Sequence, residues 1–211
     1  IVRLVGSEMC IRDRENTDPK LIKEMRDYYF NQIESYKKNK NKNITIDKMP
    51  LNLVHVGEIL RFFPNAKFIL ALRHPYDCVL SCFMQNFMLN HAMANFLNLD
   101  DTLKLYDLTM SLWKKYTNVF KIDHHLIRYE DVVSNFKKTI GDLLKFLNVK
   151  WSDNVSEFYK TAEKRGIINT PSYNQVSQPI YSNSMYRWKN YEKEFAKSNI
   201  SLENWVKEFN Y

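Results

Sequence analysis

Apolar and polar positions alternate along the chain in blocks whose spacing predicts helices separated by short strands. Residues 18–38 place apolar side chains at helical intervals, and Asp18 followed by Pro19 is typical of a helix start. After the polar run KKNKNKN, residues 44–47 form a short β-branched segment that predicts a buried strand. Residues 51–63 return to helical spacing and stop before a proline. The first part of the chain is therefore predicted as helix, strand and helix.

The stretch KFILALRHPYDCVLSCF, residues 67–83, predicts a strand, a tight turn and a helix. It begins with an apolar run of strand length, and after the turn Val79, Leu80 and Phe83 supply apolar anchors at helical spacing. Arg73 stands at the turn itself. Open α/β sheets bind ligands at the carboxyl ends of their strands, and a helix N-terminus attracts anions. The stretch therefore predicts an anion site that includes Arg73.

The remaining pattern continues the alternation of strands and helices. Residues 84–99 mix apolar and polar positions and predict helix and loop at the mouth of a cleft. Beyond them the spacing predicts a helix at 101–119, a strand at 124–129, helices at 132–147 and 151–164, an ordered loop or lid at 170–186 and a last helix at 188–209. Strands that alternate with helices favour an α/β fold with a parallel sheet.

Composition fits one globular domain with a basic surface. The chain has 211 residues, and Lys plus Arg exceed Asp plus Glu by 31 − 24 = 7. This excess suits an anionic ligand, an acidic substrate, nucleic acid or membrane headgroups, and it suits a merely solvated basic surface equally well. Cys10, Cys78 and Cys82 follow no disulfide or zinc pattern, so we expect neither a metal nor a structural disulfide. No apolar run is long enough to span a membrane.

The first residues do not resemble the start of a domain. The string VGSEMCIRDR is similar to translated adapter sequence that contaminates some assembled transcripts. We therefore expect residues 1–14 to be non-native and the native sequence to begin at residue 15, with the true N-terminus missing.

Five segments of the chain occur in an order that resembles one enzyme family. They are DKMPLN (47–52), FPNAKFILALRHPYDCVLSCF (63–83), HLIRYEDVV (125–133), PSYNQV (171–176) and YRWKNY (186–191). Together, over residues 44–195, they resemble the sulfotransferases that use 3′-phosphoadenosine 5′-phosphosulfate (PAPS). Within that family they resemble the tyrosylprotein sulfotransferase-like branch, which includes bacterial forms linked to tetratricopeptide repeats. The resemblance implies a P-loop-NTPase-like parallel sheet flanked by helices, here N-terminally truncated, with residues 15–211 as the C-terminal part of the domain.

The resemblance implies four cofactor-binding residues. Arg73 and Ser81 match the residues that hold the 3′-phosphate, and a guanidinium with a hydroxyl nearby is suited to grip such an anion. Tyr129 matches a tyrosine near the nucleotide, and Arg187 matches a basic residue on the 3′-phosphate side. Taken singly, the same residues also fit a surface arginine, a packing serine, a half-buried tyrosine and a helix start.

The resemblance implies two further residues at the reacting end of the cofactor. Lys48 matches a lysine at the oxygen that bridges sulfate and 5′-phosphate, where a cation stabilises the charge that develops during transfer. Ser172 matches a serine that assists at the phosphosulfate, although loop serines are usually turn formers. Asp77 is expected to stabilise the start of its helix, because a carboxylate there would repel phosphate. His74 could act as a base, but a spectator role is favoured.

One part of the family's pattern is absent. The family opens with a strand and a Gly-rich loop whose backbone amides cradle the 5′-phosphosulfate, and the acidic base of the tyrosylprotein branch follows soon after. The four glycines of this chain, at positions 6, 57, 141 and 166, lie in no such loop. The chain on its own is therefore expected to bind the 3′-phosphate end weakly and to turn over poorly or not at all.

The function expected from the sequence is transfer of a sulfuryl group from PAPS to a hydroxyl acceptor such as a protein tyrosine. The basic balance suits an acidic peptide or an anionic glycan as the acceptor. The alternative is a non-catalytic basic module that binds nucleotides or nucleic acid, but no recognition-helix, RNP or zinc signature supports nucleic acid as a partner. A P-loop kinase would need a Walker lysine and a magnesium carboxylate, and neither can be placed.

Overall fold

The computed structural model describes residues 18–36, 44–160 and 180–211. It divides into two compact units, Ile1–Ala66 and Lys67–Tyr211, and we describe each by itself. The prediction that residues 1–14 are non-native falls outside the described residues and stays a prediction. Within the described residues, no helix combines the length and the apolar character needed to cross a bilayer.

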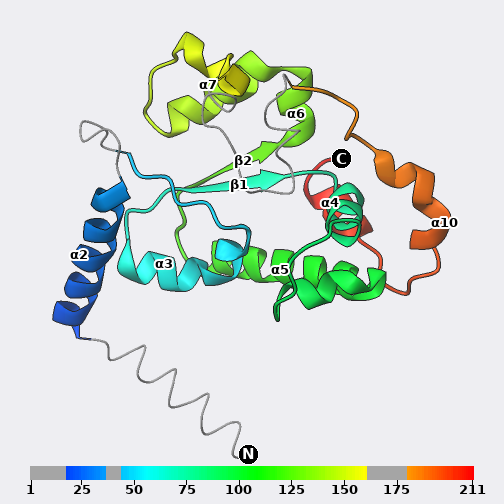
Figure 1. The fold of residues 1–211 in the computed structure, drawn as a ribbon, viewed down its shortest axis with the longest axis horizontal. Coiled ribbons are helices and arrows are strands. Elements are labelled where there is room, and N and C mark those ends of the chain that lie inside the picture. The colour runs from blue at the N-terminus through cyan, green and yellow to red at the C-terminus, as the bar shows by residue number, and fades with distance from the viewer. Residues whose placement is uncertain (1–17, 37–43, 161–179) are drawn as a thin grey trace, which may run out of the picture. The chain divides into compact units, whose positions relative to one another are not determined.

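The described part of the N-terminal unit has two α-helices and one 3-10 helix. Helix α2 spans Pro19–Tyr36, close to the predicted range, and the Asp18 carboxylate accepts the Lys20 N–H at 2.9 Å at its start. The 3-10 helix η1 spans Pro50–His55 and α3 spans Val56–Phe62 (Figure 1). A ring cluster of Tyr29, Phe30 and Phe63, with centroids 5.1–5.6 Å apart, joins α2 to the end of α3. Aromatic packing therefore holds this unit together.

One prediction in this unit is wrong, and another is met only in part. Residues 44–47 form neither strand nor helix, and Ile44 and Ile46 are 53% and 75% exposed. Among the described residues no strand lies beside them to complete a ladder, and Asp47 instead accepts hydrogen bonds from the Tyr29 hydroxyl at 2.8 Å and the Asn52 amide at 3.3 Å. The predicted helix at 51–63 begins as a 3-10 turn, because the Asn52 N–H bonds the carbonyl three residues back.

The C-terminal unit is built on two parallel strands. Strand β1 (Phe68–Leu72) pairs with β2 (His124–Arg128), and the register places Leu72 opposite Arg128. Helix α5, Leu99–Val119, lies in the connection between them. A parallel pair with a helical crossover confirms the predicted α/β class with a parallel sheet flanked by helices.

Helices cover both sides of the two strands. Helix α5 lies on one side, and α6 with α7 lies on the other (Figure 1). The helices in the described residues of this unit are α4 (Pro75–Phe83), η2 (Met93–Leu97), α5, α6 (Tyr129–Ser134), α7 (Phe136–Phe146), η3 (Asp153–Val155), η4 (Arg187–Tyr191), α10 (Glu192–Phe195) and α11 (Glu203–Glu208). The core joins the strands and α4 to α5 and the C-terminal helices through the buried residues Leu70, Leu72, Val79, Leu80, Leu103, Met110, Trp113, Phe195, Leu202, Trp205 and Phe209.

The two strands and the helices α4 and α5 confirm the predictions, whereas later helices are shorter than predicted. The helix predicted at 132–147 is two helices, because the Asn135 side chain accepts the Lys138 N–H at 3.3 Å and starts α7 anew. The helix predicted at 188–209 breaks after α10, where the Ser198 and Ser201 hydroxyls accept backbone N–H groups two residues ahead. The predicted anchor Phe83 is 39% exposed.

Two further predictions are met only in part. Residues 84–99 contain the short helix η2 within loop, as expected. The helix predicted at 151–164 is a three-residue 3-10 turn, η3, followed by helical residues only at 158–160, the limit of the described segment. Most of the predicted lid at 170–186 lies outside the described residues.

Candidate functional site

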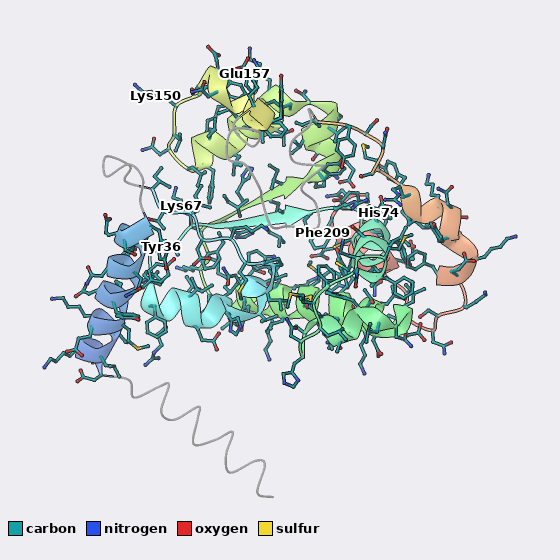
Figure 2. The ribbon with its side chains drawn as sticks, in the orientation of Figure 1. Tyr36, Lys67, His74, Lys150, Glu157 and Phe209 are labelled. Carbon is teal, nitrogen blue, oxygen red and sulfur yellow. The ribbon has the colours of Figure 1, made fainter. Side chains whose placement is uncertain are left out.

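Two strand-to-helix junctions lie side by side at the carboxyl ends of β1 and β2. The pairing of Leu72 with Arg128 makes the residues after each strand neighbours. The His74 N–H, at the start of α4 (Figure 2), donates to the Glu130 carboxylate at 2.9 Å, and both residues are buried. The hydrogen bond fixes the two junctions to each other.

Arg73 stands on the first junction with one of its nitrogens unused. Its Nη2 donates to the Ser184 carbonyl, and its guanidinium lies 5.8 Å from the centre of the Tyr129 ring. The Tyr129 hydroxyl donates to the Tyr181 carbonyl at 2.6 Å. Arg73 Nε is buried and has no hydrogen-bond partner among the described residues. A buried N–H of a charged group is costly to leave unpaired, so this atom is suited to an anionic ligand.

The carboxylate of Asp77 fastens a distant segment to α4. Asp77 is fully buried, and its two oxygens accept the N–H groups of Tyr186 and Trp188 at 2.5 and 2.9 Å. Arg187 lies between these two residues, at the start of η4. The sequence predicted that Asp77 stabilises the start of its own helix, but its hydrogen bonds to Tyr186 and Trp188 were not predicted.

Arg73, Tyr129 and Asp77 together hold residues 181–188, which we call the strap. Arg73 binds the carbonyl of Ser184, Tyr129 binds that of Tyr181, and Asp77 binds two amides further on. The strap carries Arg187, so it brings a second arginine to the junction that carries Arg73.

His74 is packed among aromatic rings. It stacks on Trp188 with centroids 5.1 Å apart and an interplanar angle of 15°, and it meets the edges of Tyr186 and Tyr211 at 5.7 and 5.2 Å. Burial lowers the pKa of His74, although the nearby carboxylates of Asp77 and Glu130 act in the opposite direction. This packing gives the ring a role in attaching the strap.

The structure brings the four predicted cofactor-binding residues onto three connected segments. Arg73 and Tyr129 follow the two strands, and Arg187 lies exposed on the strap. Ser81 is exposed on α4 one turn beyond Asp77, and residues four apart share a helix face. Lys48 is exposed in the N-terminal unit, and Ser172 lies outside the described residues.

The cysteines of α4 lie close to this site. Cys78 and Cys82 are free thiols four residues apart. The hydrogen bond with Cys78 lowers the pKa of Cys82, and the charge of Arg73 adds to this effect while burial opposes it. Among the described residues, no three His, Cys, Asp or Glu side chains are grouped to hold a metal ion.

Sequence reasoning missed the roles of Asp77 and Glu130. An aspartate in the first turn of a helix is common for reasons of the helix dipole alone, so it does not signal a tertiary contact. Its partner Tyr186 is 109 positions away. Glu130 follows a strand in a polar pair with Asp131, and only the fold shows that one of the two is buried.

Comparisons with known proteins relate the chain to sulfotransferases. The model of the sulfotransferase family matches residues 8–153. A protein of undescribed function from Aquifex aeolicus is 31% identical over 180 residues, which are 83% of this chain and 23% of that protein. Protein-tyrosine sulfotransferase 1 of Danio rerio is 27% identical over 157 residues, 69% of this chain and 42% of the relative. Protein-tyrosine sulfotransferase 2 of Gallus gallus is 25% identical over 67% of this chain and 39% of its own length.

A solved structure shares the fold. The sulfotransferase domain from the curacin biosynthetic pathway superposes with a TM-score of 0.56 at 18% identity, covering 88% of this chain and 68% of that domain. The chain spans 23% to 42% of the lengths of the curated relatives it matches.

Proposed function

The chain belongs to the sulfotransferase family, and on this premise we propose that it holds the 3′-phosphate half of a PAPS site in an enzyme that sulfates a hydroxyl acceptor. When bound, PAPS supplies the sulfuryl group. The named relatives support a protein tyrosine as acceptor. The net charge of +7 supports an acidic peptide or an anionic glycan around it.

The observation that carries the proposal is the environment of Arg73. Its guanidinium stands after β1, at the carboxyl end of a parallel strand and at the start of α4, where an α/β sheet binds anions. Its buried Nε is without a partner among the described residues, and no described carboxylate forms a salt bridge with it. Arg73 therefore has both the charge and the free donor that a phosphate needs.

The other predicted residues have matching roles. Ser81, exposed on α4, and Arg187, exposed on the strap, are proposed as further donors to the 3′-phosphate. Tyr129 is proposed to orient Arg73 through its ring and to border the nucleotide. Lys48 is proposed to stabilise the charge on the leaving oxygen, and Ser172 to assist at the phosphosulfate.

Isothermal titration of the 211-residue chain with adenosine 3′,5′-bisphosphate tests the proposal, with adenosine 5′-monophosphate as the comparison ligand. We expect a preference for the bisphosphate, and a loss of about 10- to 100-fold in its affinity in Arg73→Ala, because a hydrogen-bonded charge contributes about 1.5–3 kcal/mol. Lys121→Ala removes an exposed cation from the loop before β2, at the other end of the strands, and is expected to leave binding unchanged.

Two results would contradict the proposal. One is an equal affinity for both nucleotides in the unaltered chain. The other is a bisphosphate affinity in Arg73→Ala that equals that of Lys121→Ala.

A further inference from the structure

We propose that Asp77 is a positioning residue that holds the strap so that Arg187 reaches the same bound phosphate as Arg73. This inference rests on the proposed function, because it concerns how the 3′-phosphate site is assembled. Asp77 itself does not touch the ligand. It acts through the backbone on either side of Arg187.

The first support is the use that Asp77 makes of its charge. The carboxylate is fully buried, and its partners are the two backbone amides of the strap, with no salt bridge to a described cation. A buried charge is retained only where hydrogen bonds compensate its lost hydration. Both oxygens are committed to the residues on either side of Arg187, so the contact fixes the direction in which this side chain leaves the backbone.

The second support is the backbone of Tyr186. Its φ of 55° is left-handed, a conformation that a bulky side chain adopts only when the surroundings impose it. The Asp77 carboxylate holds the amide of this same residue. The residue with the strained backbone, Tyr186, is therefore also the one whose N–H is held by Asp77, and it lies immediately before Arg187. We call the pair of Asp77 hydrogen bonds to Tyr186 and Trp188 the clamp.

The third support is that the other side-chain hydrogen bonds to the strap lie further from Arg187 than those of Asp77. Arg73 and Tyr129 bind carbonyls at Ser184 and Tyr181, before the strained turn. Trp188 stacks on His74 and Tyr76 through its ring, which sets the ring plane. Among the described residues, the bonds of Asp77 are the side-chain hydrogen bonds to the residues next to Arg187, where the Lys189 N–H also donates to the Tyr186 carbonyl at 3.2 Å.

Charge gives this clamp a second effect. Two arginines at one site repel each other, and a buried carboxylate between their segments offsets that repulsion without occupying the anion's position. Asp77 thus allows Arg73 and Arg187 to converge before any ligand arrives, which lowers the cost of ordering them on binding.

Amide hydrogen exchange on the unaltered chain, followed by NMR without nucleotide, tests the clamp directly. We expect the amides of Tyr186 and Trp188 to be protected, and at least one of them to exchange more than 10-fold faster in Asp77→Asn, since the amide side chain offers a single acceptor oxygen. Asp100→Asn, an exposed aspartate in the first turn of α5, is the matched control and should change neither amide. Fast exchange of both amides in the unaltered chain would overturn the inference whether or not the variant folds.

Titration with the two nucleotides tests the consequence. Asp77→Asn and Arg187→Ala should each reduce the preference for adenosine 3′,5′-bisphosphate over the 5′-monophosphate by about 10-fold, and the double variant should lose no more than Arg187→Ala alone. Additive losses, or an unchanged preference in Asp77→Asn, would show that Asp77 does not act through Arg187. If the unaltered chain shows no preference at all, the proposed function fails instead.

Discussion

The two strands of the C-terminal unit each lead into an arginine, and the two arginines are used differently. Arg128, the last residue of β2, forks onto Asp131 with bonds of 2.7 and 2.8 Å and also binds the carbonyls of Phe209 and Asn210. Arg73, just after β1, has one hydrogen bond to a carbonyl and a buried Nε without a described partner. The first arginine is neutralised inside the fold, whereas the second has no carboxylate partner among the described residues.

The contrast indicates how function can be separated from stability within one sheet edge. The hydrogen bond with Asp131 raises the pKa of Arg128, so this cation is stabilised by the protein itself. It ties β2 to the C-terminal residues. Arg73 has no such carboxylate, and its neighbours Tyr129 and the strap orient it without neutralising it. We expect substitutions at the two junctions to separate in the same way.

The largest expected effects are a loss of stability on substitution of Arg128 and a loss of ligand affinity on substitution of Arg73. Arg128→Ala should lower the free energy of unfolding by about 1–3 kcal/mol, because a half-exposed bidentate ion pair and two carbonyl bonds are lost. Arg73→Ala should destabilise the fold less than Arg128→Ala, because it removes one carbonyl bond and no ion pair, while weakening bisphosphate binding as described above. Urea unfolding followed by tryptophan fluorescence measures the first quantity. Equal destabilisation by both substitutions would remove the distinction.

Glu130, which joins the junctions, should have the next largest effect. Glu130→Ala leaves the His74 N–H buried and unpaired, which costs about 1–3 kcal/mol of unfolding free energy. Glu130→Gln keeps an acceptor oxygen and should cost less. Thermal melting of both variants provides the measurement, and a Gln variant as unstable as the Ala variant would show that the negative charge matters more than the hydrogen bond.

His74 should make stability depend on pH. Burial keeps its folded pKa below the unfolded value of 6.5, so the unfolded chain takes up a proton first as the pH falls. The C-terminal unit should therefore lose stability from about pH 6.5 down to the lower folded pKa, and should be unaffected by this group above that range. Between pH 5 and 8, the melting temperature should depend less on pH in His74→Phe, which keeps a ring in the stack, than in the unaltered chain. The exposed control His91→Gln should show the same pH dependence as the unaltered chain. Parallel curves would contradict the assignment.

The smallest expected effect is at Tyr129. Tyr129→Phe removes the hydrogen bond to the Tyr181 carbonyl but keeps the ring beside Arg73. We expect a loss of about 0.5–1.5 kcal/mol in unfolding free energy and less than a tenfold change in bisphosphate affinity. Tyr129→Leu, which also removes the ring, should weaken binding further, and equal affinities for the two variants would show that the ring does not orient Arg73.

The elements that could be predicted from sequence are those defined by local pattern. The apolar runs of β1 and β2 and the helical periodicity of α4 and α5 are enough to predict these elements from local sequence. The interruptions of the helices at Asn135 and Ser201 could not be predicted. The side chains of these residues accept backbone N–H hydrogen bonds and interrupt the helix without changing the spacing of apolar residues. Residues 44–47 have the composition of a strand. A strand forms only when it pairs with a neighbour, and the sequence of the segment does not show whether a neighbour is present.

The residues proposed to bind the ligand were identified from sequence, and those that support them were not. Arg73, Ser81, Tyr129 and Arg187 follow from segments that resemble a known family, and the fold places them on connected segments. Asp77 acts on amides that are more than a hundred positions away, and backbone amides carry no sequence signal. The ligand-binding roles of these four residues, and those of Lys48 and Ser172, stay predictions.

The most direct test of the contrast between the two arginines is to observe their side chains during ligand addition. Arginine Nε–H signals in a ¹⁵N-labelled chain can be assigned with Arg73→Lys and Arg128→Lys. On titration with adenosine 3′,5′-bisphosphate, we expect the Arg73 signal to move and become protected from exchange, while the Arg128 signal stays in place. Adenosine 5′-monophosphate should move neither signal. A stationary Arg73 signal, or an equal movement at Arg128, would contradict the claim that only Arg73 is kept available for a phosphate.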